Sequence, residues 1–564
     1  MEQNKYIISR KINNTHNCIK LDLNEYDFEH CSEVNTFFKK NVFNPNFITK
    51  YNNLFNDNFM ALSQKIKDIN NIDNINQILL TAGSDDALEY IISTFINHNT
   101  NVLLFTPTYS YFECCIKRIN CNIYEIPLDF EDNNDIEMSL NFYEDIINNN
   151  TVVYIVNPNN PLGTLINKQY IKNIANKWKK TIFIIDEAYI EYTNSNSSVE
   201  FINECSNIII TRTFSKAYGL AGLRLGYILS NYHNINKISL LYNEKRVTQI
   251  ALETGLIILN NNYYYKKIIN DTINIRQEFK LFLCNNNINF INSYANFISI
   301  YIGDNYSQML DIFEQNNIYV RNRSNIQNMY GFIRITIGNE QNINIIKKLI
   351  SENINLFDKK KPIYMFYCKK EFIWKLKYLL KKIVDIFNKN NLIFWLDSGS
   401  LLGLYRHNGI IPWDDDVDLA INNNNVEHLL SLKNELNNNG LRLKKNRTNA
   451  YYQIDFIDDI NPNPNAAHIT NNIHVDIFLY QKNNNNYYIN TDPRFTEKDY
   501  FKCNFQYYDI ENNLINHKFY NILNIKIPNN IVDILDTFIL SDYKNYAVIN
   551  EKVTFKLNKS IQYA

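Results

Sequence analysis

Residues 151–189, TVVYIVNPNNPLGTLINKQYIKNIANKWKKTIFIIDEAY, decide the fold of the first half of the chain. The segment contains two short apolar runs, TVVYIVNP (151–158) and TIFIIDEAY (181–189), each of which ends in polar residues. Between them, residues 167–180 have the apolar spacing of an amphipathic helix. An apolar strand, a helix and a second apolar strand are typical of two parallel strands buried on both faces and joined by a crossover helix.

The same alternation continues on both sides of this segment, from about residue 75 to about residue 340. NVLLFTP (101–107) and NIIITRTFS (207–215) are further candidates for buried strands, and SDDALEYIISTFIN (84–97) has helical spacing. Alternating strands and helices favour an α/β fold with a doubly wound, parallel sheet. Such sheets bind ligands at the carboxyl ends of their strands, so functional side chains are expected there.

The composition of the chain limits the classes of protein to which it can belong. Its 564 residues favour about two to four domains, and 45% hydrophobic with 20% charged residues is typical of a globular protein. The net charge of -1 provides no general attraction for nucleic acid or an anionic membrane. We find no signal-peptide pattern, no apolar stretch of membrane-spanning length and no zinc-ligand spacing among the nine cysteines. We therefore expect a cytoplasmic location (the host cytoplasm if the source is a virus), with no nucleic-acid partner and no membrane span.

A lysine follows one of the strand candidates. TRTFSKAYGLAGLRLGY (211–227) places Lys216 just after the strand, in a segment rich in small residues. A partly desolvated lysine has a lowered pKa and can form a Schiff base with an aldehyde, although most lysines are simply solvated. Other strand ends favour the reactive alternative, because they provide Tyr109, Asn160, Asp186 and Tyr189.

These residues together are the set that pyridoxal phosphate requires. The cofactor needs a lysine for its aldehyde, an acid for its pyridine nitrogen, donors for its ring hydroxyl and a flat side chain to stack on. It also needs an anion site, which the small-residue turn and helix start in TAGSDDALEYI (81–91) can provide through backbone N–H groups.

On these motifs, residues from about 20 to 350 resemble a fold-type I aminotransferase of class I/II, nearest the histidinol-phosphate aminotransferase family. The resemblance implies a large doubly wound domain with a small α/β domain, a homodimer, and a small-molecule amino donor and keto acceptor. Lys216 would bind the cofactor and later carry protons, Asp186 would contact the pyridine nitrogen, and Asn160 with Tyr189 would contact the ring oxygen. Tyr109 would stack on the ring, unless it is only a core residue. The residues implied for the phosphate are Ser84, Asp85, Ser215 and Arg224, and Asp85 could also be only a helix cap.

The same resemblance implies residues that bind the substrate. Arg334 in FIRITIG would grip the α-carboxylate as a bidentate fork, and Arg321 in IYVRNR would help to bind a phosphorylated or anionic substrate. Asn24 belongs to LDLNEYDF, which resembles the N-terminal arm of the family.

The chain departs from the family pattern at two positions. Leu162 replaces the usual Thr of a turn, a change that we expect to be tolerated. Asn52 replaces the usual Pro after Tyr51, the tyrosine implied to reach the cofactor phosphate of the partner subunit.

A domain boundary is expected where a helical pattern stops at a charged run and Pro362. We place it near residue 357, which gives a first domain of residues 1–357 and a second domain of residues 358–564. The second domain has a different strand pattern, for which an α+β fold is expected.

Four aspartates stand close together in FWLDSGSLLGLYRHNGIIPWDDDVDLAI (394–421). If this segment is extended, Asp414, Asp416 and Asp418 point to one face and Asp415 to the other. Two carboxylates on one face can bind a divalent cation. A third acid is expected on a neighbouring strand in NNIHVDIFLY, where an unpaired charge on Asp476 would be costly.

These motifs resemble the LicD/fukutin family of nucleotidyltransferase-fold phosphotransferases, over most of residues 370–550. The resemblance implies transfer of a phospho-linked group, such as phosphocholine or a polyol phosphate, from a CDP-activated donor to a glycan. Asp416 and Asp418 would bind Mg²⁺ or Mn²⁺, with Asp476 as a third ligand or as the base. The residues implied for the donor phosphate are Gly399 and Ser400, and those left without a firm role are Asp414, Asp415, Arg406 and His407.

Three relations between the two halves remain open from the sequence. The two activities could serve one pathway that decorates a glycan. Alternatively, the first half could decarboxylate phosphothreonine or phosphoserine and supply the second half with an amino-alcohol phosphate. One half could also be a non-catalytic scaffold.

Overall fold

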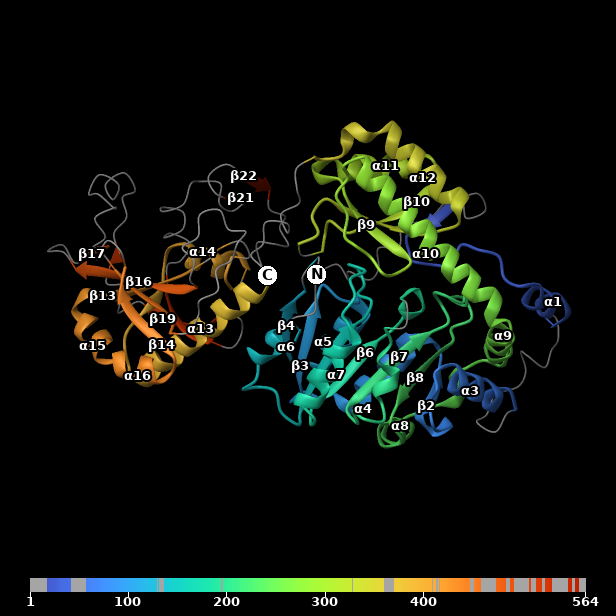
Figure 1. Ribbon diagram of the computed structural model, residues 1–564, viewed down its shortest axis with the longest axis horizontal. Helices are drawn as coiled ribbons and strands as arrows, with labels where there is room; N and C mark the ends of the chain where they lie inside the picture. Colours follow the sequence, from blue (N-terminus) through green and yellow to red (C-terminus); the bar gives the residue numbers. More distant parts are fainter. Residues whose placement is uncertain are drawn as a thin grey trace. The chain divides into compact units, whose positions relative to one another are not determined.

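The computed structural model describes most of the first two thirds of the chain and part of the remainder. The described residues are 18–41, 57–128, 130, 136–193, 196–326, 328–359, 370–407, 409–411, 414, 416–446, 451–457, 473–482, 487–490, 507–508, 514–519, 523–529, 546–549 and 553–556. They form two compact units (Figure 1). The first unit consists of Met1–Glu137 and Glu144–Pro362, and the second consists of Met138–Tyr143 and Ile363–Ala564. The second unit therefore includes a short piece of the first half, which the sequence does not predict.

The large sheet of the first unit has seven strands in the order β2-β8-β7-β6-β5-β3-β4. Their bounds are β2 Ile78–Thr81, β3 Asn101–Thr106, β4 Asn122–Pro127, β5 Thr151–Val156, β6 Ile182–Asp186, β7 Ile208–Thr213 and β8 Gly226–Ser230. All neighbours pair in parallel except β8, which is antiparallel to both β2 and β7. Parallel strands joined by helices form the doubly wound α/β sheet that the sequence predicts.

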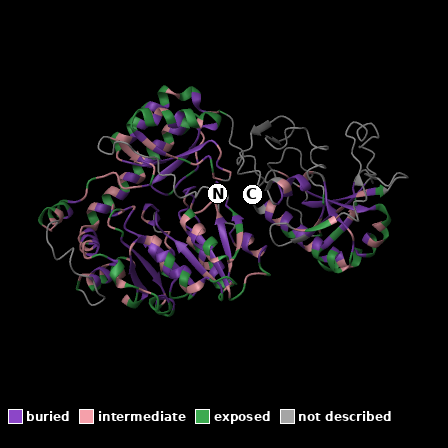
Figure 2. Cartoon of the chain, turned by 180° about the vertical axis from the view of Figure 1, so that it is seen from behind, coloured by how far each residue is buried: buried purple, intermediate pink, exposed green. Residues whose placement is uncertain are grey.

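Burial explains why these apolar runs form central strands. Every residue of β5 and β7 is buried, whereas the helices are buried on one side only (Figure 2). The helices that accompany the sheet are α4 Gly83–Phe95, α5 Ser110–Ile119, α7 Lys168–Lys177 and α8 Tyr232–Ser239. Three central core members, Leu104, Val152 and Ile184, belong to neighbouring strands, so apolar side chains cover the sheet across its width.

A smaller sheet in the same unit has the order β1-β10-β11-β9. Its bounds are β1 Ile19–Leu21, β9 Phe297–Tyr301, β10 Ile318–Asn322 and β11 Phe332–Thr336. The short strand β1 pairs in parallel with β10, so the N-terminal arm is fixed beside the C-terminal part of the unit. The remaining helices are α1 Ser32–Asn41, α3 Asp57–Ile69, α6 Ile136–Asn141, α9 Gln249–Asn260, α10 Asn262–Asn285, α11 Tyr306–Gln315 and α12 Glu340–Glu352.

The second unit is built on a mixed sheet. Its main path has the order β12-β13-β16-β15-β14, and β17 pairs with β16 off this path and with β18. Among these described strands only β13 and β16 pair in parallel. The strand bounds are β12 Trp395–Leu396, β13 Val417–Asn422, β14 Leu441–Lys445, β15 Tyr452–Phe456, β16 His474–Lys482, β17 Tyr487–Asn490 and β18 Tyr507–Tyr508. The helices of this unit are α13 Lys370–Lys389, α14 Ser398–His407, α15 Val426–Ser431 and α16 Lys433–Asn438. Two separate strand pairs follow in the chain, β19 Leu514–Phe519 with β20 Leu523–Pro528 and β21 Tyr546–Ile549 with β22 Val553–Lys556.

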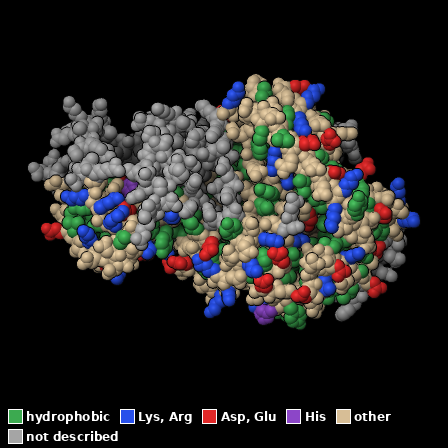
Figure 3. Space-filling view, viewed as in Figure 1, with side chains coloured by type: hydrophobic (Ala, Val, Ile, Leu, Met, Phe, Trp, Pro, Cys, Tyr) green, Lys and Arg blue, Asp and Glu red, His purple; other side chains and the backbone are tan. Residues whose placement is uncertain are grey.

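The surface of the described part carries both signs of charge. On the face shown in Figure 3, basic and acidic side chains are interspersed, in keeping with a net charge of -1. No helix among the described residues has both the length and the apolar character that crossing a membrane requires.

Two candidate active sites

The first candidate site begins at Asp186, the last residue of β6. Its side chain is buried, Tyr154 Oη donates a hydrogen bond to Oδ2 at 3.0 Å, and the Ala188 N–H donates to Oδ1 at 3.2 Å. Burial raises the pKa of Asp186 to about 6, although both hydrogen bonds oppose the shift. The strand end therefore holds a carboxyl group that is ready to share a proton with a basic ring nitrogen.

Lys216 follows β7, the neighbouring strand. Its Nζ donates a hydrogen bond to the Leu23 carbonyl at 3.0 Å and lies 5.9 Å from the centroid of the Tyr189 ring. The Tyr189 hydroxyl accepts hydrogen bonds from Asn160 Nδ2 at 3.2 Å and from Asn24 Nδ2 at 3.0 Å. Because both amides donate to this oxygen, the hydroxyl retains its own proton for donation to a ligand.

The predicted phosphate residues lie around the start of α4. Asp85 Oδ1 accepts from Tyr109 Oη at 2.8 Å, and Asp85 Oδ2 accepts from Arg224 Nη2 at 2.7 Å. Gly83 has a φ of +86°, and a Cβ there would lie 2.7 Å from Arg224 Nη2. A Cβ on Gly226 would lie 2.6 Å from the Gly83 carbonyl carbon, so only small residues allow β8 to approach this helix start so closely.

Two further residues predicted for this cradle have different degrees of burial. Ser215 is buried, and its hydroxyl accepts a hydrogen bond from Thr213 Oγ1 at 2.9 Å, whereas Ser84 is half-buried near the start of α4. Tyr51, predicted to reach the partner subunit, lies outside the described residues.

A cluster of arginines occupies one face of the small sheet. Arg334 is buried, and its Nη1 and Nη2 donate to Asn160 Oδ1 at 2.7 Å and to the Asp22 carbonyl at 2.8 Å. Arg321 lies directly opposite Arg334 in the register of β10 and β11. Arg323 stands two positions after Arg321, just beyond the end of β10. Its N–H donates to the Phe332 carbonyl at 3.0 Å, so the extended pairing continues and alternation puts its side chain on the same face.

The buried positive charges of the arginine cluster repel one another, and a bound anion would reduce this repulsion. Burial lowers the pKa of Arg334 to about 10, and burial together with the charges of Arg334 and Arg321 lowers the pKa of Arg323 well below its ordinary value. The Nε atoms of Arg323 and Arg334 have no hydrogen-bond partner among the described residues. The sequence prediction named Arg321 and Arg334 but not Arg323, although alternation along IYVRNR places both of its arginines on one face.

The second candidate site lies between β13, β16 and α14. Asp418 and Asp476 are direct partners in the parallel register, and both are buried. The Gly399 N–H donates to Asp418 Oδ2 at 3.2 Å, and the Asp418 N–H donates to Ser400 Oγ at 2.8 Å. A Cβ on Gly399 would lie 3.3 Å from Asp414 Oδ2, so the start of α14 faces the acids closely.

The acids of this site are close enough to affect one another. Burial raises the pKa of Asp418 well above its ordinary value, and the carboxylates that raise it further are Asp416, Asp414, Asp476 and Asp397. One ligand atom each from Asp416, His474 and Asp476 lies within 4.8 Å of the others. Asp397 is buried, and Tyr480 Oη donates to its Oδ2 at 2.9 Å.

The structure brings together some of the residues that the sequence predicts for this site. Asp416, Asp418, Asp476, Gly399 and Ser400 converge, whereas His474 and Asp397 were not predicted. His474 stands two positions before Asp476, and Asp397 follows β12 and stands two positions before Gly399. This closeness to predicted residues is the signal that the sequence offered. Asp415 and the side chains of Arg406 and His407 lie outside the described residues.

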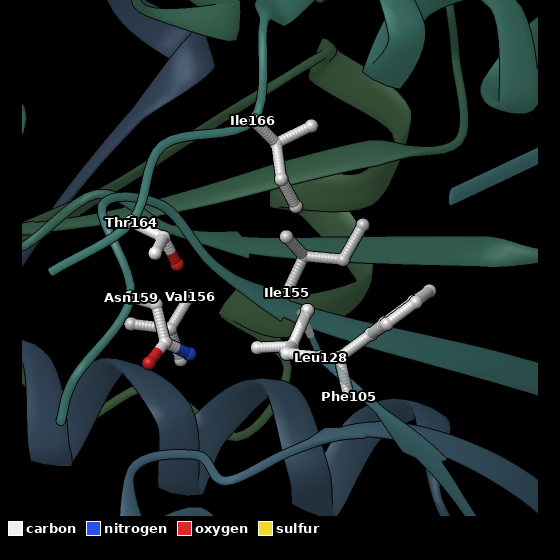
Figure 4. Close-up of a pocket in the computed structure, with 7 residues that line it drawn as sticks. All are labelled: Phe105, Leu128, Ile155, Val156, Asn159, Thr164 and Ile166. Atoms are coloured by element: carbon white, nitrogen blue, oxygen red, sulfur yellow. The ribbon is translucent and has the colours of Figure 1, made fainter. Parts of the chain in front are cut away.

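A separate pocket beside the NPNNPLG turn is not part of either site (Figure 4). It is lined mainly by apolar side chains: Phe105, Leu128, Ile155, Val156, Asn159, Thr164 and Ile166. The side-chain amide of Asn159 already forms hydrogen bonds within the protein. Its Nδ2 donates to the Pro107 carbonyl at 3.1 Å, and its Oδ1 accepts from the Leu162 N–H at 3.0 Å. This pocket therefore offers little to a polar ligand.

The seven-stranded sheet with polar residues at its strand ends, followed by a small sheet, defines the first unit as a fold-type I α/β transferase. Residues 16–349 match the aminotransferase class I and II family, and the chain belongs to this family. Residues 391–555 match the LicD/FKTN/FKRP nucleotidyltransferase domain.

Individual proteins agree with this classification. The chain is 33% identical over 344 residues to a dihydroxyacetone phosphate transaminase of Campylobacter jejuni, which covers 60% of this chain and 90% of that protein. It is 29% identical over 344 residues to a histidinol-phosphate aminotransferase of Brachyspira hyodysenteriae, with 59% and 92% covered. The solved histidinol-phosphate aminotransferase from Sinorhizobium meliloti in complex with pyridoxal-5'-phosphate matches with a TM-score of 0.53 and 21% identity, over 60% of this chain and 91% of that one. The structural likeness shows the fold, and the predicted resemblances to both families are confirmed.

Proposed function

We propose that the first unit binds pyridoxal phosphate and transfers an amino group between an amino acid and a small phosphate ester. When bound, the cofactor supplies an aldehyde and a ring that accepts electrons from the reacting carbon. The observation that supports it best is Asp186. This carboxyl is buried at a strand end, its pKa is raised, and the groups that oppose the shift are hydrogen-bond donors rather than cations. A protonated ring nitrogen is the partner that such an acid fits.

The other residues of the site fit the remaining parts of the cofactor. Lys216 Nζ would hold the aldehyde carbon and afterwards carry a proton to and from the reacting atoms. The Tyr189 hydroxyl would donate to the ring oxygen, because two amides already occupy it as an acceptor. The start of α4 with Arg224 would hold the phosphate through backbone N–H groups and a guanidinium.

The arginine cluster supports a phosphorylated substrate. Arg321, Arg323 and Arg334 put three guanidinium groups on one face of the small sheet. A dianionic phosphate ester would neutralise more of this charge than a single carboxylate does. The names of the two relatives given above also specify phosphate esters, dihydroxyacetone phosphate and histidinol phosphate.

A test uses matched substrates with the full chain. We expect amino transfer from histidinol phosphate to 2-oxoglutarate, or from glutamate to dihydroxyacetone phosphate, and much slower transfer from unphosphorylated histidinol to 2-oxoglutarate. The Arg323→Gln variant should raise KM for the phosphate ester about tenfold or more, because a charge-assisted hydrogen bond is lost. Arg118→Gln, an exposed arginine on α5, is the control and should have no effect.

Other outcomes would redirect the proposal. Equal activity with histidinol and histidinol phosphate would contradict a phosphate-ester substrate. Release of CO₂ from phosphothreonine or phosphoserine, without amino transfer, would establish the decarboxylase alternative.

We propose that the second unit transfers a phospho-linked group from a CDP-activated donor to a glycan, with Mg²⁺ or Mn²⁺ held by its buried acids. Asp418 and Asp476 on paired strands, with Asp416 beside them, support a cation site, because buried carboxylates repel one another unless a cation lies between them. The start of α14, where Gly399 and Ser400 contact Asp418, supports a position for donor phosphates next to this cation.

The released nucleotide provides the test of the second proposal. Transfer from a CDP-linked donor frees CMP, so we expect metal-dependent CMP formation by the full chain when CDP-choline or a CDP-linked polyol is offered with a glycan. Asp416→Asn should abolish CMP release, and Lys216→Ala should leave it unchanged. Absence of CMP release with every donor would favour the scaffold alternative for this half.

The two proposals are chemically compatible in one chain. Amino transfer to a keto phosphate ester yields an amino-alcohol phosphate, which becomes a CDP-linked donor once it has been activated. We propose that the two units serve one such pathway and that the chain forms a homodimer, as the aminotransferase resemblance implies.

A further inference from the structure

His474 is the first residue of β16 and is buried. It stands two positions before Asp476, so both side chains point to the same face of the sheet. Asp418 is the register partner of Asp476 in β13, and Asp416 stands two positions before Asp418. The imidazole is therefore on the face that carries the acids.

The donor atoms of this group lie close to the spacing of ligands around a single ion. One atom each from Asp416, His474 and Asp476 lies within 4.8 Å of the others. Ligand atoms at about 2.0–2.2 Å from one ion are roughly 3–4 Å apart, so a small inward movement would complete the arrangement.

The neighbouring strand orients this group. Gln453 Nε2 donates to Asp476 Oδ1 at 2.9 Å, which fixes the carboxylate. Asp455, the register partner of His474, is held by Arg442 at 2.9 Å and by Lys444 at 2.6 Å. The acid directly across from the imidazole is therefore held by the cations of β14. The imidazole itself contacts an acid of the site, with His474 Nε2 3.3 Å from Asp476 Oδ1.

We propose that His474 is a nitrogen ligand of the divalent cation in the second unit, together with Asp416 and Asp476. This inference rests on the proposed metal-dependent function of that unit. Magnesium binds oxygen ligands almost exclusively, whereas an imidazole favours transition metals. A mixed nitrogen and oxygen site therefore selects Mn²⁺, or a related transition metal, over Mg²⁺.

The alternative is that His474 only forms a hydrogen bond to Asp476 and orients it, as an outer-shell residue does. In that case the imidazole nitrogen would not contact the ion. A measurement that detects nitrogen bound to the metal separates the two roles directly.

The test is pulsed electron paramagnetic resonance of the full chain loaded with Mn²⁺ alone. We expect ¹⁴N modulation from a bound imidazole, which disappears when the protein is labelled with ¹⁵N-histidine or carries His474→Gln. His428→Gln changes another histidine of the same unit and should leave the modulation intact. Titration should show that His474→Gln weakens Mn²⁺ binding about tenfold or more and Mg²⁺ binding much less.

A second variant keeps the test valid if His474→Gln folds poorly. His474→Asp replaces the nitrogen by a carboxylate oxygen, so it should bind Mg²⁺ more tightly than the wild type while lacking the ¹⁴N signal. Wild-type Mn²⁺ binding without ¹⁴N modulation would overturn the role of His474 and leave the metal site standing. No saturable Mn²⁺ binding at all would overturn the metal site as well.

Discussion

At the scale of single residues, Asp186 combines two properties that oppose each other in the absence of a ligand. It is buried, and in the role proposed for it, it has to be ionised to attract a protonated ring nitrogen. Burial raises its pKa from 3.8 to about 6, so at neutral pH the ligand-free protein holds an ionised carboxylate at a cost in stability.

This cost predicts a pH effect in the cofactor-free protein. A raised carboxyl pKa means that the folded state binds the proton more tightly than the unfolded state, so stability falls as pH rises from about 4 to about 6. A shift of about 2 pKa units corresponds to roughly 3 kcal/mol. We expect Asp186→Asn to lack this loss, so that its melting temperature exceeds that of the wild type by more at pH 7 than at pH 4.5.

Half-buried Glu191, whose pKa desolvation raises to about 7, titrates in the wild type and the variant alike, so the difference between them isolates Asp186. Parallel melting profiles of the two proteins over this pH range would contradict the assignment.

Gly83 permits the close approach of Arg224 to the start of α4. Its φ of +86° is unfavourable for other residues, and a Cβ would press on the guanidinium. We expect Gly83→Ala to lower the free energy of unfolding by about 1–2 kcal/mol, since left-handed backbone costs about that much. It should also weaken binding of pyridoxal phosphate, because the added Cβ displaces the Arg224 guanidinium. Gly222→Ala, in the same segment as Arg224 but with open space around its Cβ, should bind as the wild type does in a fluorescence titration.

At the scale of elements, the strands of the first unit could be predicted because their apolar runs are short, β-branched and bounded by polar residues. Lys216, Asp186 and Tyr189 follow such runs, so their meeting at one sheet edge could be foreseen. Arg323 and His474 were missed although each stands two positions from a predicted residue, Arg321 and Asp476, and alternation along an extended chain places such neighbours on one face. Register, as between Arg321 and Arg334, cannot be read from a single sequence.

Leu162 stands in a turn at a position where the aminotransferase resemblance implies Thr. Its side chain is fully buried, and its N–H donates to Asn159 Oδ1 at 3.0 Å. Restoring the usual residue by Leu162→Thr should lower the free energy of unfolding by about 2–4 kcal/mol, because a hydroxyl and a cavity replace packed carbon. Leu240→Thr changes a leucine that is 86% exposed and should leave urea unfolding of the first unit nearly unchanged. Equal effects of the two substitutions would contradict this account of the turn.

At the scale of the whole molecule, the sequence predicts two different kinds of unit, and the family matches confirm them over residues 16–349 and 391–555. The inclusion of Met138–Tyr143 in the second unit could not be predicted, because a short segment far from its partners carries no periodic signal. Within the second unit, Phe142 lies against Trp374 of α13, with ring centroids 5.6 Å apart. The boundary near residue 357 and the homodimer stay predictions.

The central claim is that Lys216 holds pyridoxal phosphate in the first unit, and a visible absorption spectrum of the purified chain tests it most directly. We predict a visible band from the lysine-bound cofactor that Lys216→Ala lacks, and that shifts when histidinol phosphate or glutamate is added. If Lys216→Gly also lacks the band, and both variants melt as the wild type does, the loss of the band reflects the missing lysine and not misfolding. A wild type that stays colourless after addition of pyridoxal phosphate would contradict the claim, and only the acids of the second unit would then remain as a candidate active site.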